Sequence, residues 1–176
     1  MTRDLPVGPA SALKSPTVRF ILSDPAYFIA CGFGSGLSPK APGTAGSLAA
    51  IPFFLLLSPA LSRGEWLVFI GLAFAVGVAV CEKTGRALGV ADHGAIVWDE
   101  MVALWLVLVF VPARWTWWAA AVVLFRLFDI WKPFPIGYVD RIKNGFGVMA
   151  DDIGAALYAL AVLRAALVLA HRLHGG

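Results

Sequence analysis

The chain has 176 residues, the length of about one domain. Hydrophobic residues make up 60% of it and Asp, Glu, Lys and Arg only 14%, against roughly 25% charged residues in typical soluble proteins. This composition favours a protein with much of its surface in lipid. The net charge of +3 comes from 14 Lys and Arg that form no basic run, which argues against disorder and against nucleic acid as a partner.

Composition divides the chain into a polar, proline-containing segment over residues 1–30, one helical domain over 31–170 and a short tail over 171–176. The prolines in the first forty residues interrupt the apolar run that a signal peptide needs, so we expect the N-terminus to stay in the cytoplasm. Cys31 and Cys81 belong to no CxxC motif or Cys/His cluster. Neither a zinc site nor a disulfide scaffold is therefore expected.

Five apolar segments separated by short polar joints follow the N-terminal segment, and each predicts a helix. The prediction is an all-α bundle embedded in a membrane. The first segment, residues 41–62, is interrupted by prolines and glycines, so its regular helix is expected over 47–57. The other four segments span residues 66–81, 101–111, 115–128 and 153–170.

The regular part of each segment is shorter than the about 20 residues of a membrane-spanning helix, so the membrane prediction depends on charge placement. If the N-terminus is cytoplasmic and all five segments cross, nine Lys and Arg fall inside and three outside, as the positive-inside rule requires. A very hydrophobic soluble bundle is the alternative, because buried helices also reach these lengths. Tryptophans at the expected helix ends resemble interfacial belts, with Trp66, Trp115, Trp117 and Trp118 outside and Trp98 and Trp131 inside.

In this topology the acidic residues gather on the cytoplasmic side of the membrane, and only Glu65 falls on the outer side. Carboxylates beside membrane helices are candidates for function, because their desolvation is costly. Asp99 and Glu100 open one predicted helix, and Asp151 and Asp152 open the last. Each pair therefore has an alternative role, in which it caps a helix and complements the positive end of the helix dipole.

Asp129 resists the capping explanation, because it ends a helix, where the dipole disfavours an anion. It needs a nearby cation, either Arg126 three residues earlier or a divalent metal ion shared with the other acids. Several hard carboxylate oxygens suit Mg²⁺. The candidate metal ligands are Asp99, Glu100, Asp129, Asp151 and Asp152.

A glycine-rich stretch over residues 32–47 is the candidate phosphate-binding segment. Small residues let backbone N–H groups approach an anion, hydroxyls and a lysine add donors, and a helix N-terminus follows. The stretch is neither a P-loop nor a dinucleotide fingerprint, and a turn-rich entry to a membrane helix would look similar. The candidate phosphate ligands are Gly34, Ser35, Gly36, Ser38, Lys40, Gly43 and Thr44.

Three segments together resemble the phosphatidylglycerophosphatase A family: GFGSGLSPKAPGT at 32–44, VWDE at 97–100 and FRLFDIWKPFPI at 125–136. The resemblance continues through GFGVM at 145–149 and covers roughly residues 25 to 165. It implies a Mg²⁺-dependent lipid phosphatase of the bacterial inner membrane that converts phosphatidylglycerophosphate to phosphatidylglycerol and phosphate. It also implies about five to six helices packed around a central helix.

The mechanism that fits these residues is metal-assisted hydrolysis of a phosphomonoester at the cytoplasmic surface, with Asp129, Asp99 and Lys132 as catalytic residues. A carboxylate outside the metal shell would act as the base, or Asp129 would form a covalent aspartyl-phosphate. The substrate, an anionic phospholipid, would keep its acyl chains in the bilayer. Two alternative functions are a membrane cation carrier or channel subunit and a purely structural membrane protein. The sequence does not indicate the oligomeric state.

Overall fold

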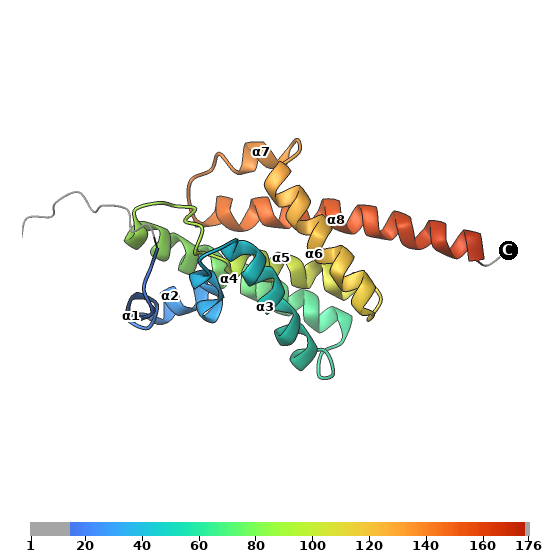
Figure 1. The fold of residues 1–176 in the computed structure, drawn as a ribbon, viewed down its shortest axis with the longest axis horizontal. Helices are drawn as coiled ribbons and strands as arrows, with labels where there is room; N and C mark the ends of the chain where they lie inside the picture. The colour runs from blue at the N-terminus through green and yellow to red at the C-terminus, as the bar shows by residue number, and fades with distance from the viewer. Residues whose placement is uncertain (1–14, 175–176) are drawn as a thin grey trace, which may run out of the picture.

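The computed structural model describes residues 15–174, which form helices and loops with no β-strand among them (Figure 1). The first fourteen residues of the predicted N-terminal segment and the last two of the tail lie outside the described residues. In chain order the helices are α1 (Val18–Ile21), α2 (Pro25–Ala30), the 3₁₀ helix η1 (Gly32–Leu37), α3 (Pro42–Leu57), α4 (Arg63–Leu88), α5 (Trp98–Phe110), α6 (Trp115–Trp131), α7 (Ile136–Val139) and α8 (Gly145–His174).

All five predicted helices are present, and α4 shows how local sequence sets their ends. The Ser62 hydroxyl accepts a hydrogen bond from the Glu65 N–H, and the Glu65 carboxylate accepts one from the Ser62 N–H, which forms a capping box. At the other end, Gly89 adopts a left-handed conformation with φ of 77°. α4 is therefore longer at both ends than its apolar stretch.

The last helix, α8, begins at Gly145, well before the predicted start at residue 153. Two polar side chains set this start. The Asn144 side chain accepts from the Gly147 N–H at 2.9 Å, and the Glu82 carboxylate of α4 accepts from the Gly145 N–H at 2.6 Å. The boundary depends on a contact between residues 63 positions apart.

The centre of the bundle is α5, which packs against α3, α4, α6 and α8 and confirms the expected central helix (Figure 1). Its side chains are buried around nearly the whole circumference, and Trp105 is only 1% exposed. Trp105 donates its indole N–H to the Ala50 carbonyl at 2.9 Å. With 13 residues, α5 is about 20 Å long, shorter than the about 30 Å hydrocarbon core of a bilayer.

Among the described residues, α4 and α8 are the two helices long and apolar enough to cross a membrane. Most of their apolar surface is not covered by the rest of the bundle, as the exposed Val68 and Leu72 on α4 and Val168 and Leu169 on α8 illustrate. Large exposed apolar faces are typical of contact with lipid. Two of the described helices are thus long enough to cross a membrane, whereas the sequence suggested five crossings.

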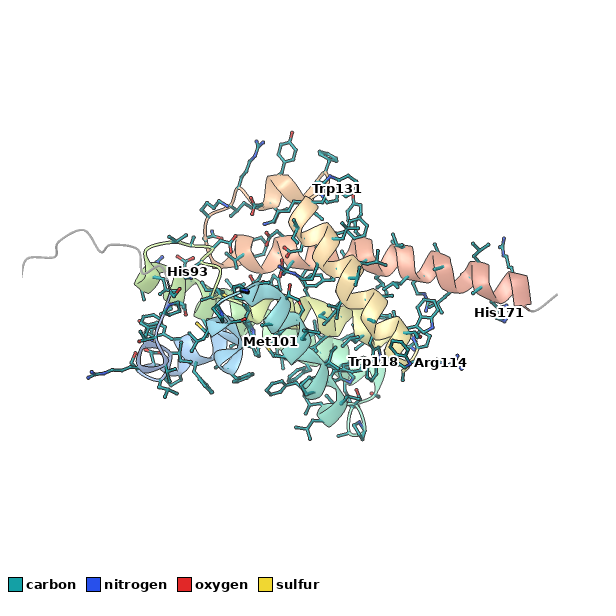
Figure 2. The ribbon with its side chains drawn as sticks, viewed as in Figure 1. His93, Met101, Arg114, Trp118, Trp131 and His171 are labelled. Carbon is teal, nitrogen blue, oxygen red and sulfur yellow. The ribbon has the colours of Figure 1, made fainter. Side chains whose placement is uncertain are left out.

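The predicted tryptophan belts are only partly correct. Trp66 and Trp98 are buried. Trp66 packs against Trp105 of the central helix, and Trp98, the first residue of that helix, donates its indole N–H to the Ala73 carbonyl of α4 at 3.0 Å. Trp115 and Trp131 are instead 78% and 70% exposed, at opposite ends of α6. Figure 2 shows Trp131 near α7, far from Arg114, which precedes the other end of α6.

Candidate active site

Three buried carboxylates form the carboxylate cluster, which we define as Asp99, Glu100 and Asp152. One oxygen of each lies within 4.8 Å of those of the other two. Asp99 and Glu100 belong to the first turn of α5, and Asp152 lies in α8. Their exposed fractions are 5%, 9% and 3%, so the fold brings three acids from two helices into the protein interior.

The cluster has unused ligand capacity. Glu100 Oε2 and Asp152 Oδ2 are buried and have no hydrogen-bond partner. Burial, followed by the charges of Glu100 and Asp152, raises the pKa of the Asp99 carboxyl well above its usual range. Burial also raises the pKa of Glu100, and the neighbouring Asp99 and Arg126 partly offset this effect. Buried acids in this state must hold protons or be neutralised by a cation.

One cation does reach the cluster, from α6. The Arg126 guanidinium lies 3.3 Å from Glu100 Oε1 and 2.7 Å from Asp129 Oδ2. Asp129 lies in the last turn of α6. The ion pair expected as the alternative role of Asp129 is therefore present, but it joins Asp129 to the cluster. One positive charge serves four carboxylates.

Gly43, in the first turn of α3, packs directly against this arrangement. A Cβ atom at Gly43 would lie 2.3 Å from Glu100 Oε1 and 2.6 Å from Arg126 Nη1, so the close approach requires glycine. α3 has Pro42 at its first position and no side-chain cap. The first N–H groups of a helix lack intrahelical acceptors and carry the positive end of its dipole. This positive helix end therefore lies beside the carboxylate cluster.

The rest of the predicted phosphate loop is arranged differently. The Ser35 hydroxyl donates to the Gly32 carbonyl and the Ser38 hydroxyl to the Lys40 carbonyl, each at 2.8 Å. Gly36 packs against the Ala95 carbonyl. The structure thus brings Gly43 to the acids, and it engages the two serine hydroxyls within the loop. Thr44, the residue after Gly43, is half-buried. Gly34, at φ of 101°, is half-buried within η1, and the Lys40 side chain is exposed.

A second acidic group surrounds Lys132, and we call Lys132, Asp140 and Asp151 the lysine group. The Lys132 ammonium lies 2.5 Å from Asp140 Oδ1 and 2.5 Å from Asp151 Oδ2. Its hydrogen bond to Asp140 lowers the pKa of that carboxyl, although burial opposes the effect. Burial lowers the pKa of Lys132, but the hydrogen bonds with both carboxylates outweigh it, so the net shift is upward.

The predicted set of five metal ligands is therefore divided by the fold. Asp99, Glu100 and Asp152 share the cluster, Asp129 borders it, and Asp151 faces Lys132. The alternative in which Asp151 and Asp152 cap the last helix is wrong, because α8 begins at Gly145. The pair at the start of α5 does lie in a helical first turn, where the dipole favours acids.

Sequence reasoning missed three features of this site: the bridge from Arg126 to Glu100, the packing role of Gly43 and the contact of Asp140 with Lys132. The first two join residues far apart in sequence, which no spacing rule connects. Asp140 carried a usable signal, because it follows Lys132 by eight residues after a proline-rich turn that reverses the chain.

Comparison with known proteins identifies the family of this chain. The family model of phosphatidylglycerophosphatase A matches residues 28–167. A phosphatidylglycerophosphatase A of Haemophilus influenzae is 47% identical over 85% of this chain and 93% of its own length. One of Escherichia coli is 45% identical over 82% and 85%, and a putative phosphatidylinositol-3-phosphatase of Bacteroides thetaiotaomicron is 40% identical over 78% and 91%. No solved structure matches the chain. The chain therefore belongs to the phosphatidylglycerophosphatase A family, a family of phosphatases.

Proposed function

We propose that this protein is a Mg²⁺-dependent phosphatase of the bacterial inner membrane that hydrolyses phosphatidylglycerophosphate to phosphatidylglycerol and phosphate, with its site on the cytoplasmic side. The observation that carries the proposal is the buried carboxylate cluster, where Arg126 supplies one positive charge near four carboxylates. The names of the two relatives that are 45–47% identical support the substrate.

The donor set of the cluster fits Mg²⁺. Asp99, Glu100 and Asp152 offer hard oxygen atoms, and the unpartnered Glu100 Oε2 and Asp152 Oδ2 give a cation buried positions to bind. These three residues would hold the ion, since Mg²⁺ in proteins uses a few carboxylates and leaves room for water and substrate phosphate. When bound, Mg²⁺ would neutralise negative charge on the phosphate oxygens.

The substrate phosphate would be received between α3 and α6. The positive N-terminal end of α3 reaches the cluster at Gly43, and the Arg126 guanidinium is in contact range of the same glycine. Arg126 has five N–H donors, of which its buried Nε has no partner. A guanidinium and helix amides together are suited to bind an anion and to stabilise charge that develops on it.

Asp129 is the candidate to take the proton from the attacking water. It borders the cluster without belonging to it, and it forms an ion pair with Arg126. Covalent attack by Asp129 on phosphorus is the alternative mechanism. Acid quenching during turnover of ³²P-labelled substrate distinguishes the two, because only covalent attack leaves label on the protein.

The lysine group would position the site. Lys132, at the end of α6, joins Asp140 after α7 to Asp151 on α8, so it ties together the three segments that follow Asp129. These two ion pairs fit a role in holding Asp152 and Asp129 in register. Lys132 would also neutralise negative charge on the substrate.

Phosphate release by the purified protein tests this function. We expect hydrolysis of phosphatidylglycerophosphate in mixed micelles, loss of activity in EDTA and recovery with added Mg²⁺. Undiminished activity in EDTA would remove the metal from the mechanism. Because one relative is named a putative phosphatidylinositol-3-phosphatase, the assay includes phosphatidylinositol 3-phosphate, and preference for that lipid would overturn the proposed substrate.

The proposed orientation has its own test. Cysteines introduced at Arg114 and Lys143 lie at opposite ends of the bundle, before α6 and before α8. The native Cys31 and Cys81 are buried, so they should not react. In intact spheroplasts, an impermeant maleimide should label the cysteine at 114 and spare that at 143. Labelling in the reverse pattern would place the site outside the cell.

A further inference from the structure

An exposed aromatic surface lies between α6 and α8, next to the proposed site. We define the aromatic shelf as Trp131, Phe134 and Tyr138, whose exposed fractions are 70%, 76% and 60%. The Phe134 and Tyr138 rings contact each other edge to face, with centroids 5.6 Å apart. Three large aromatic side chains within eight residues present much apolar surface that the rest of the described chain leaves uncovered.

The shelf is exposed although its backbone is firmly attached to the bundle. The Phe134 carbonyl accepts a hydrogen bond from the Tyr158 hydroxyl at 2.6 Å. Ile136, between the exposed rings, is 3% exposed and packs against Gly154 of α8. One face of the segment is therefore buried against α8, and the opposite face presents the aromatic rings.

Basic side chains border the shelf. The Arg141 guanidinium stands 4.9 Å from the centroid of the Tyr138 ring, and two residues later the exposed Lys143 forms an ion pair with Asp140 at 3.5 Å. Aromatic rings with an adjacent basic group are typical of the boundary between lipid headgroups and acyl chains, where Trp and Tyr concentrate. Lys and Arg beside them attract anionic headgroups.

The shelf also lies at a suitable level along the bundle. It packs against α8 at Gly154 and Tyr158, within the first half of that candidate membrane-crossing helix. Gly154 follows Asp152 by two residues, so the shelf segment contacts α8 next to the level of the carboxylate cluster. The shelf is close to the site along the chain, because Trp131 follows Asp129 by two residues and the next residue, Lys132, binds Asp151.

We propose that the aromatic shelf lies in the headgroup–acyl boundary of an anionic phospholipid bilayer and is the surface along which the lipid substrate reaches the carboxylate cluster from the side. This inference rests on the proposed function, because it needs a lipid substrate. Its occupant is the bilayer, since the rings are combined with Arg141 and Lys143, which complement anionic headgroups.

A depth measurement tests the location of the shelf directly. The full-length Phe134→Cys variant is labelled with the fluorophore NBD and reconstituted in vesicles of phosphatidylethanolamine and phosphatidylglycerol. We expect blue-shifted emission and stronger quenching by lipids with a nitroxide near the headgroup than by lipids with one deep in the chain. The matched control is Val90→Cys, in the loop after α4, where aqueous iodide should quench instead. Iodide quenching at position 134 equal to that at 90 would overturn the proposal.

A kinetic comparison tests the route of the substrate. The Phe134→Ala/Tyr138→Ala variant is assayed on long-chain phosphatidylglycerophosphate in vesicles and on a short-chain form below its micelle concentration. We expect the vesicle rate to fall about tenfold, because two interfacial aromatic contacts are lost, and the short-chain rate to stay near that of the native protein. Trp115→Ala is the control, since Trp115 is equally exposed at the other end of α6.

Three outcomes count against the shelf. Equal losses on both substrates would make these rings part of the fold or the catalytic site, and no loss on vesicles would remove the route. Crosslinking between two copies through position 134 would assign the surface to a dimer. If the native protein hydrolyses neither substrate, the proposed function fails, and the depth measurement still decides where the shelf lies.

Discussion

Asp151 and Asp152 are neighbours in sequence, yet the structure gives them opposite surroundings. The Oδ2 atom of Asp151 lies 2.5 Å from the Lys132 ammonium. Asp152 instead lies beside Asp99 and Glu100, is 3% exposed, and has one carboxylate oxygen without a hydrogen-bond partner. Consecutive residues of an α-helix point about 100° apart, so one turn of α8 serves both groups. The lysine group has its own cation, Lys132, whereas the three acids of the carboxylate cluster share Arg126 with Asp129.

The strongest test of this difference replaces each aspartate by asparagine. We expect Asp152→Asn to lower activity by about a thousandfold or more, because a ligand of the proposed metal is lost. Without Mg²⁺, its thermal stability should hold or rise, since one of three neighbouring buried acids is removed. Asp151→Asn should retain more activity, because Lys132 keeps Asp140 as a partner. Similar losses in the two variants would show that the distinction between the groups has no catalytic meaning.

Asp129 borders the carboxylate cluster and precedes Lys132 by three residues. Its replacement tests whether its carboxylate takes part in the reaction. Asp129→Asn should reduce turnover about a hundredfold or more if the carboxylate accepts a proton. Stability should change by no more than about 1 kcal/mol, because the loss of an ion pair is balanced by relief of repulsion at a helix C-terminus. Arg126 retains Glu100 as a partner in this variant. A stable Asp129→Asn protein with native turnover would remove Asp129 from the site.

Metal binding should separate the groups without any assay of activity. At about a hundred times its dissociation constant, Mg²⁺ should stabilise the native protein by about 2.7 kcal/mol, visible as a rise in melting temperature. The rise should persist in Asp151→Asn and disappear in Asp152→Asn. Ca²⁺ serves as the comparison ion, because it prefers more ligands and longer distances. A Mg²⁺ effect that survives in Asp152→Asn would place the ion elsewhere.

The smallest expected effect belongs to the lysine group. Lys132 lowers the pKa of Asp140 in the folded protein, so this pair stabilises the fold at pH values above the unfolded pKa of about 4. The contribution is lost as the pH falls through the lower folded pKa. Because solvent screens this partly exposed pair, Asp140→Asn should cost only about 0.5–1 kcal/mol at pH 7. Denaturant unfolding at pH 7 and pH 3 measures the difference, which should shrink at the lower pH; a constant difference would assign it to packing.

Several elements of the fold were predictable because their signals are local. Apolar segments bounded by charges and glycines located all five long helices, and Ser62 with Glu65 marks the start of α4 within four residues. The family motifs and the convergence of acids toward one end of the bundle also follow from the order of residues along the chain. Hydrophobic patterning and helix capping act between neighbours, so the sequence displays them directly.

Other features depend on contacts between distant segments, and only the tertiary structure decided them. The start of α8 depends on Glu82 of α4. Trp98 is buried because the other helices surround α5, and Arg126 of α6 contacts Glu100 of α5. The sequence by itself determined that five acids belong near one another and which helices carry them. Helix rotation and packing determined that three form a cluster, since each side chain's surroundings depend on which face of α5, α6 and α8 is turned inward.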